Sequence, residues 1–182
     1  MLDRICIYQD EYLCHPSFSD VKAILELHQK KHKVYGMLGS LDCMHIHWKN
    51  YSMAWQGTHK GKEKCPTLVL EADYNLWIWH SFFGCPGTMN DINVLHNSPL
   101  FESFLKGRTF DALDYPFEMD DQVFRNCYYL VDGIYPELSR FVKTIPLPVK
   151  RDQKRFAEWQ EAAQKDIERC FGVLQCQFQI VS

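Results

Sequence analysis

Two aspartates stand where strands are expected to present them for chemistry. Asp42 lies in the short stretch Gly39–His45, which we expect to form part of a strand. Asp132 directly follows Tyr128–Val131, an apolar run with the aromatic and β-branched residues of a buried strand. Gly133 then lets the chain turn sharply. A carboxylate at the C-terminal end of a strand is well placed to bind a metal ion or a substrate.

A third acid, Glu168, belongs to a long helical pattern over residues 150–175. Apolar residues recur there at steps of three and four, which predicts a stripe that packs on the sheet. Glu168 beside Ile167 would lie at the edge of that stripe. An ordinary surface glutamate that forms a salt bridge would occupy the same position equally well. The expected stripe comprises Phe156, Trp159, Ala163, Ile167, Cys170, Phe171 and Leu174.

Two strand-borne aspartates and a later helix-borne glutamate favour a phosphodiester-cleaving site as the first hypothesis. That reaction needs an activated water and stabilisation of the departing 3′ oxygen. Two magnesium or manganese ions roughly 4 Å apart supply both without a protein nucleophile. Such hard cations prefer carboxylate oxygens as ligands. The spacing of the acids, taken alone, supports this hypothesis only weakly.

Four ordered segments carry a resemblance to a known family. They resemble the DDE nuclease domain of PIF/Harbinger transposases, in particular the plant-type branch and its domesticated nuclear relatives. The likeness extends from about Met37 to the C-terminus. The segments are Gly-Ser-Leu-Asp-Cys-Met-His (39–45), Pro-Gly-Thr-Met-Asn-Asp-Ile-Asn-Val-Leu (86–95), Val-Asp-Gly-Ile-Tyr-Pro (131–136) and Asp-Ile-Glu-Arg-Cys-Phe-Gly-Val-Leu (166–174).

The resemblance implies an α/β fold with an RNase H-like mixed sheet flanked by helices. It implies metal-dependent DNA cleavage and strand transfer in the nucleus, with Mg or Mn as cofactor and a separate Myb-like DNA-binding partner. Asp42, Asp132 and Glu168 match the catalytic acids, with Asp42 as the bridging ligand, and Asp91 matches a further metal ligand. The alternatives are a domesticated, non-catalytic nuclear protein that binds proteins or chromatin, and a pseudogene product that folds poorly.

Asp91 also has a purely structural explanation. Thr88 and Asp91 fit a helix capping box, and Asn90 is placed either to orient Asp91 or to cap the helix itself. A zinc site at Cys43, His45 and His47 is a further alternative, because alternate residues of a strand share a face. These three lack the usual second pair of ligands of a closed zinc site. The resemblance places His45 at a family position beside the first aspartate, which favours packing or substrate orientation as its role.

Two groups of basic residues are candidate contacts to the DNA backbone. One group lies in a polar loop, and the other opens the long helical pattern. Solvated surface positions explain both groups as well, since clustered cations serve either role. The candidates are Lys60, Lys62 and Lys64 in the loop, and Lys150, Arg151 and Lys154 at the helix start.

Residues 1–36 are expected to be a helical lead-in, and residues 37–182 a nuclease domain that is incomplete at its C-terminus. The lead-in helix is predicted over residues 18–28, with Ser19 or Asp20 as N-cap and an apolar face of Val21, Ile24, Leu25 and Leu27. The basic run that follows, residues 28–33, is expected to be a solvated helix end.

Further strands are expected over residues 67–72 and 76–83, as an antiparallel pair, and over residues 140–145. The strand at 76–83 carries large apolar side chains on both faces, which predicts a central place in the sheet. Residues 105–125 show no clear periodicity and are expected to be a solvated insertion.

Composition sets the remaining limits. A chain of 182 residues with 46% hydrophobic and 14% aromatic residues suits one packed domain. The net charge of −3 does not favour a strong stand-alone nucleic-acid binder, although metal-binding acids contribute to it. No segment has the pattern of a membrane span or a signal peptide, so no membrane partner is expected. The eight cysteines form no Cys-x-x-Cys pair and are expected to be reduced.

Overall fold

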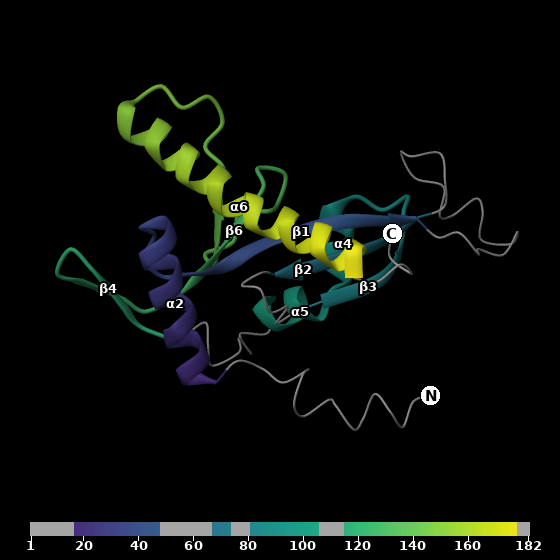
Figure 1. Cartoon of the computed structure of the whole chain (residues 1–182), viewed down its shortest axis with the longest axis horizontal. Coiled ribbons are helices and arrows are strands. Elements are labelled where there is room, and N and C mark those ends of the chain that lie inside the picture. Colours follow the sequence, from purple (N-terminus) through teal and green to yellow (C-terminus); the bar gives the residue numbers. More distant parts are fainter. Residues whose placement is uncertain (1–16, 48–66, 74–80, 106–114, 178–182) are drawn as a thin grey trace, which may run out of the picture.

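The computed structural model describes residues 17–47, 67–73, 81–105 and 115–177 (Figure 1). The loop lysines Lys60, Lys62 and Lys64 lie outside these ranges, so their expected contact to DNA stays a prediction. Along the chain the elements are α2 (Phe18–His32), β1 (Met37–His47), β2 (Thr67–Asp73), β3 (Ser81–Pro86), α4 (Asp91–Asn97), α5 (Pro99–Leu105), β4 (Phe117–Met119), β5 (Gln122–Phe124), β6 (Tyr128–Val131), β7 (Phe141–Lys143) and α6 (Arg151–Gln177).

A five-stranded mixed sheet in the order β3-β2-β1-β6-β7 forms the centre of the fold. The chain builds one half by antiparallel pairing of β1 with β2 and of β2 with β3. It builds the other half by parallel pairing of β1 with β6 and of β6 with β7. The predicted mixed α/β fold is confirmed. Of the strand expected to be central, at residues 76–83, only residues 81–83 are described. They belong to β3, which lies at the edge of the described sheet, whereas the longer β1 has described partners on both sides.

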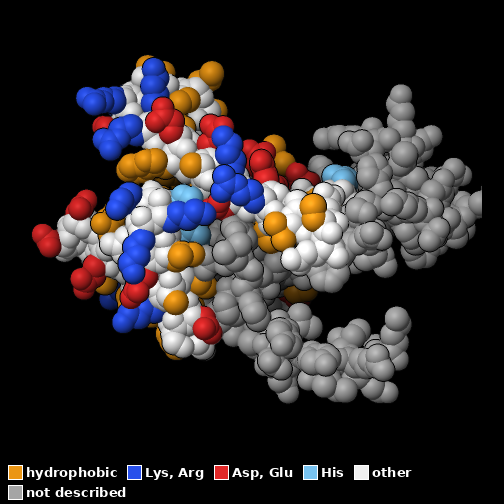
Figure 2. Space-filling model, viewed as in Figure 1, with side chains coloured by type: hydrophobic (Ala, Val, Ile, Leu, Met, Phe, Trp, Pro, Cys, Tyr) orange, Lys and Arg blue, Asp and Glu red, His pale blue; other side chains and the backbone are white. Residues whose placement is uncertain are grey.

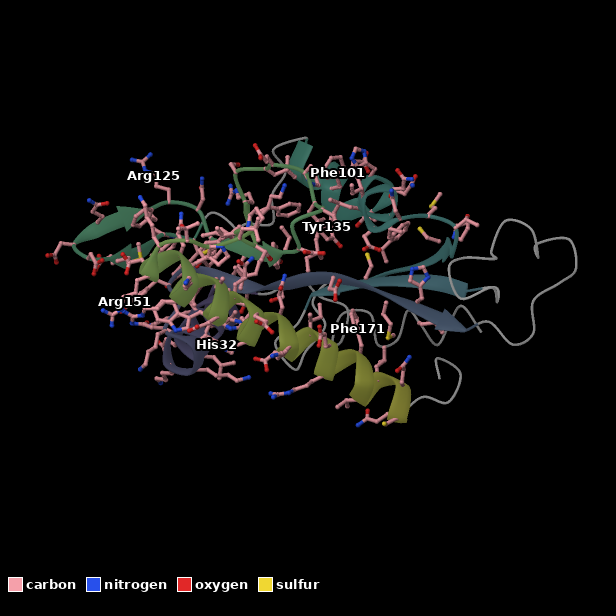
Figure 3. The ribbon with its side chains drawn as sticks, turned by 90° about the horizontal axis from the view of Figure 1, so that it is seen from above. His32, Phe101, Arg125, Tyr135, Arg151 and Phe171 are labelled. Atoms are coloured by element: carbon pink, nitrogen blue, oxygen red, sulfur yellow. The ribbon has the colours of Figure 1, made fainter. Side chains whose placement is uncertain are left out.

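Helices cover both faces of this sheet. The long helix α6 runs across one face, while α4 and α5 lie on the other (Figures 1 and 3). On the α6 face, Ile46 of β1 packs with Ile167 and Phe171 of the helix. On the opposite face, Tyr135 and Phe101 belong to the largest core cluster (Figure 3). Each strand must therefore send alternate side chains into two separate apolar layers.

An irregularity at the start of β1 determines which residues face α6. The register of β1 against β6 shifts between Met37 and Gly39. Beyond the shift, Leu41 packs in the core cluster opposite α6, whereas Met44 and Ile46 pack against α6. Because side chains alternate along a strand, Asp42 shares the α6 face with Met44 and Ile46.

Helix α2 begins with a capping box at Ser17, not at the expected Ser19 or Asp20. The Asp20 N–H donates to Ser17 Oγ at 3.3 Å, and the Ser17 N–H donates to the Asp20 carboxylate at 2.8 Å. The prediction of the N-cap was wrong because Asp20 fills the third helical position of the same motif, where an acid reaches back to the cap.

One position of the apolar face of α2 also differs from the prediction. Leu27 is 44% exposed, whereas His28 is 3% exposed and takes the buried position instead. The basic run at the helix end is accordingly not all solvated. The other expected apolar residues, Val21, Ile24 and Leu25, are buried.

The stretch expected to be a solvated insertion contains regular structure. Helix α5 ends at Leu105, and β4 and β5 form a hairpin separated from the main sheet. Its turn residues Asp120 and Asp121 have φ values of 50° and 61°, the left-handed region that a tight two-residue hairpin turn requires. Aspartate tolerates this region better than most residues, which is the signal that the sequence pattern contained.

Candidate acidic site

Asp42 and Asp132 follow one another across the parallel pair β1 and β6. The last residues that these two strands pair with each other are Ser40 and Leu130, and each aspartate lies two residues further along its chain segment. Neighbouring strands are about 4.8 Å apart, so the two positions are adjacent. Each carboxylate accepts a hydrogen bond from the next residue's N–H, from Cys43 at 2.8 Å and from Gly133 at 2.5 Å. The predicted placement of Asp132 at the end of its strand is confirmed.

The electrostatic surroundings of Asp42 connect it to the other three predicted acids. Burial, with a further contribution from the carboxylates of Asp91, Glu168 and Asp132, raises the pKa of Asp42 to about 6, against the hydrogen bond from Cys43. Tertiary folding therefore brings Asp91 of α4, Asp132 after β6 and Glu168 of α6 within electrostatic range of Asp42 on β1. Repulsion by these three carboxylates adds to the effect of burial on the pKa of Asp42.

Asp91 reaches this region as the first residue of α4. The N-cap of this helix is Asn90, whose side-chain oxygen accepts the Asn93 N–H at 2.9 Å. The predicted capping box of Thr88 and Asp91 is wrong, because the helix begins too late for Asp91 to occupy the third position. Asn90 takes the capping role that was one of its two expected roles, so capping does not explain an acid at position 91.

Glu168 is exposed on α6 and lies beside Ile167, which is 1% exposed and packs against Ile46 and Phe171. The predicted position at the edge of the packed face is confirmed. The expected apolar stripe is confirmed in part, because Ala163, Ile167 and Phe171 are buried whereas Trp159 is 38% exposed.

The donor chemistry of the four acids fits a hard divalent cation, which takes oxygen ligands. Within residues 17–47, 67–73, 81–105 and 115–177, no three His, Cys, Asp or Glu side chains are grouped closely enough to hold a metal ion. This applies to the four acids, whereas the zinc alternative includes His47, whose side chain lies outside the described ones, so that alternative stays a prediction. Carboxylates without a cation between them repel one another, which opposes closer approach.

Tyr135 is a residue of this region that the sequence pattern did not single out. Its side chain is 1% exposed, and its hydroxyl lies 3.4 Å from the Cys43 sulfur, next to Asp42 in the chain. Its N–H donates to the Asp132 carbonyl at 3.2 Å. Burial, Cys43, Asp91 and Asp42 all raise the pKa of Tyr135, so its hydroxyl keeps its proton. The residue thus ties the turn after Asp132 to β1.

Asp166 is a second residue that the pattern did not identify. It is 4% exposed and accepts hydrogen bonds from Lys31, from His32 at 2.9 Å and from Arg169 at 3.2 Å. Burial raises the pKa of Asp166, but the bonds from Lys31 and His32 outweigh it and leave the pKa below its ordinary value. This cluster holds α2 against α6 close to Glu168.

Basic side chains gather over α2 and α6 on the face shown in Figure 2. Lys150, Arg151 and Lys154 are exposed at the start of α6, as expected. Gln153 caps this helix end by accepting the N–H groups of Val149 at 3.2 Å and Lys150 at 3.1 Å.

None of the described cysteines forms a disulfide bond; they are Cys43, Cys85, Cys127, Cys170 and Cys176. No helix in the described ranges combines the length and apolar character needed to cross a membrane.

Comparison with known proteins gives one match. A family model described as plant transposon protein matches residues 10–182. No curated protein and no solved structure matches the chain.

Proposed function

The chain belongs to the plant transposon protein family, and from this premise we propose that it is a Harbinger-type DDE endonuclease domain. It would cleave DNA phosphodiester bonds in the nucleus with two divalent cations, Mg or Mn. The observation that carries the proposal is the placement of Asp42 on β1 and Asp132 just after β6, each two residues beyond the last β1–β6 pair, beside α6, the helix that bears Glu168.

The sheet supports the proposal at the level of the fold. Its three antiparallel strands are followed by two parallel ones, with the first acid on β1 and the second after β6. We propose that this arrangement is RNase H-like. An acid on the central strand, an acid on its parallel neighbour and an acid on the covering helix then face one space.

In the proposed mechanism, Asp42, Asp132 and Glu168 would hold the two cations, with Asp42 as the ligand shared between them, and Asp91 would be an additional ligand. When bound, such cations would supply the activation of a water and the stabilisation of the departing 3′ oxygen. Asp42 must lose its proton to bind, and its pKa of about 6 places that loss just below neutral pH. The buried hydroxyl of Tyr135, on the opposite face of the sheet, contacts Cys43 and so links the turn after Asp132 to β1.

We propose that the DNA backbone passes over the start of α6, where Lys150, Arg151 and Lys154 are exposed. Phosphate contacts of this kind position a duplex without reading its sequence. A separate Myb-like protein would then supply sequence recognition.

A second candidate is a non-catalytic nuclear protein that acts through protein binding. The observation that favours it is the exposed apolar segment before α6, where Leu147 is 91% exposed and Val149 is 82% exposed. Large exposed apolar groups are typical of protein interaction sites.

Manganese titration by calorimetry, followed by a nicking assay, separates the two candidates. We expect wild type to bind Mn²⁺ and nick DNA, Asp132→Ala to lose Mn²⁺ binding, and Glu168→Gln to lose nicking. The matched control is Glu161→Gln, an exposed acid of the same helix that pairs with Lys165 at 3.2 Å. A folded wild type that neither binds Mn²⁺ nor nicks DNA would reject the nuclease and favour the protein-binding candidate.

A further inference from the structure

A glutamine side chain is buried between α6 and the sheet. Gln160 is 1% exposed, and its Nε2 donates to the carbonyls of Val131 at 3.4 Å and Val142 at 3.2 Å. These carbonyls belong to the neighbouring parallel strands β6 and β7. One amide group therefore bridges two strands from the covering helix.

The bridged position is next to the proposed site. Val131 is the last residue of β6 and immediately precedes Asp132. Glu168 lies on the same helix as Gln160, eight residues further on, which is about 12 Å along the helix axis. The hydrogen bonds of Gln160 thus connect the strand that ends just before Asp132 to the helix that carries Glu168.

The apolar contacts of α6 do not define its position in the same way. Ala163, Ile167 and Phe171 hold the helix on the sheet by burial, which has no preferred direction. Hydrogen bonds weaken steeply when the donor and acceptor are misaligned. The bonds of Gln160 therefore restrict the rotation and sliding of α6 that its apolar stripe would tolerate.

Stability does not explain a glutamine at this position. Its Oε1 is buried without a hydrogen-bond partner among the described residues, and an unsatisfied buried polar group destabilises the folded state. An apolar side chain of similar size would avoid that cost. A position that is suboptimal for stability but directional in its contacts is typical of a functional constraint.

We propose that Gln160 is a positioning residue, which sets the axial and rotational position of α6 and thereby the separation of Glu168 from Asp132. The inference rests on the proposed function in so far as these two acids act together. Its geometric part concerns the placement of α6 and is testable without metal or DNA.

The test compares Gln160→Met with Gln164→Met, the same change one turn further along α6. Methionine preserves chain length and helix propensity while removing the amide. Spin labels attached by non-cysteine chemistry at Val173 and Ser139, both exposed, report the position of α6 relative to the sheet. We expect a shifted or broadened distance distribution in Gln160→Met, an unchanged one in Gln164→Met, and unfolding temperatures at or above that of wild type.

The functional readout is Mn²⁺ affinity. Loss of a residue that orients metal ligands weakens affinity by about 10- to 100-fold, and we expect this for Gln160→Met with the KM for DNA unchanged and kcat reduced. If wild type binds Mn²⁺ and Gln160→Met binds it equally well with an unchanged distance distribution, the inference is wrong. If wild type binds no Mn²⁺, the proposed function fails, and the spin-label distances alone still decide whether Gln160 positions α6.

Discussion

Asp42 is the residue at which folding and the proposed chemistry oppose each other. It is partly buried on the α6 face of β1, and burial together with Asp91, Glu168 and Asp132 raises its pKa to about 6. A carboxylate in such surroundings is destabilising until a cation balances its charge. Functional sites commonly retain residues of this kind at a cost in stability.

Replacing Asp42 should therefore stabilise the metal-free protein. The folded-state pKa lies above the ordinary value of 3.8, so wild-type stability falls as pH rises from about 4 to about 6 and stays lower above that. We expect Asp42→Asn to be more stable than wild type by about 1–2 kcal/mol at pH 7.5, after allowance for partial exposure, and to lose Mn²⁺ binding.

Denaturant unfolding in EDTA at pH 4.5 and pH 7.5 measures this difference. Glu161→Gln, which removes an exposed acid from α6, serves as the control and should change stability little. An Asp42→Asn variant less stable than wild type at pH 7.5 would show that the carboxylate is satisfied in the fold.

At the scale of elements, α6 is held at points that an apolar stripe does not reveal. Asp166 binds Lys31 and His32 of α2, and Gln160 binds β6 and β7. The same α2 surface contains His28, which is buried and stacks on His32 with ring centroids 5.9 Å apart. Electrostatic contacts therefore contribute to both the position and the pH dependence of the helix pair.

The buried His28 should make the protein less stable in mild acid. Burial, with the neighbouring charges of His32 and Lys31, lowers the pKa of His28 to about 4. The Leu38 backbone and the Asp166 carboxylate act in the opposite direction and raise it. The unfolded chain then binds more protons than the folded one between about pH 6.5 and pH 4, so this contribution is lost as pH falls through that window.

Comparison of His28→Leu with wild type isolates the effect from the opposite contribution of Asp42. We expect the variant to gain about 2–3 kcal/mol relative to wild type between pH 7 and pH 4.5, measured by urea unfolding. His96→Leu, which changes an exposed histidine of α4, should show no such gain. A constant difference between His28→Leu and wild type across this range would contradict the prediction.

The β4–β5 hairpin depends on a glycine in the segment before β1. Gly36 has a φ of 73°, and a Cβ at this position would lie 2.2 Å from the Phe117 ring. Phe117 in turn stacks on Phe124 with ring centroids 5.2 Å apart. The hairpin therefore packs against backbone that only glycine leaves open.

We expect Gly36→Ala to destabilise the protein by about 2 kcal/mol or more, because strain and overpacking add. A double-mutant cycle with Phe117→Ala separates the two causes, measured by thermal unfolding. Coupling between the two changes indicates the ring contact, whereas strict additivity would assign the whole effect to the positive φ.

At the scale of the whole molecule, the proposed cation site joins segments from most of the chain. Its acids come from β1, α4, β6 and α6, so a cation bound by them would link both halves of the sheet and both helical layers. A ligand that binds only the folded state stabilises it according to its concentration and affinity.

Manganese should therefore raise the unfolding temperature. At 100 times the dissociation constant, the expected stabilisation is about 2.7 kcal/mol, and EDTA should reverse it. Asp132→Ala should show no shift in the same scan, with Glu161→Gln again as the control. An equal shift in wild type and Asp132→Ala would mean that Mn²⁺ binds elsewhere.

The family resemblance implied the mixed α/β class and the grouping of the four acids. The sequence by itself determined the strand at Gly39–His45, the bounds of β6 and the long helix α6. These follow from local periodicity and turn residues, which depend on near neighbours in the chain. Tertiary structure decided the order of the strands, the edge place of β3 and the buried roles of His28, Gln160, Asp166 and Tyr135. Polar side chains become buried only where a distant segment supplies a partner or a place in the core, and no local pattern specifies which segment that is.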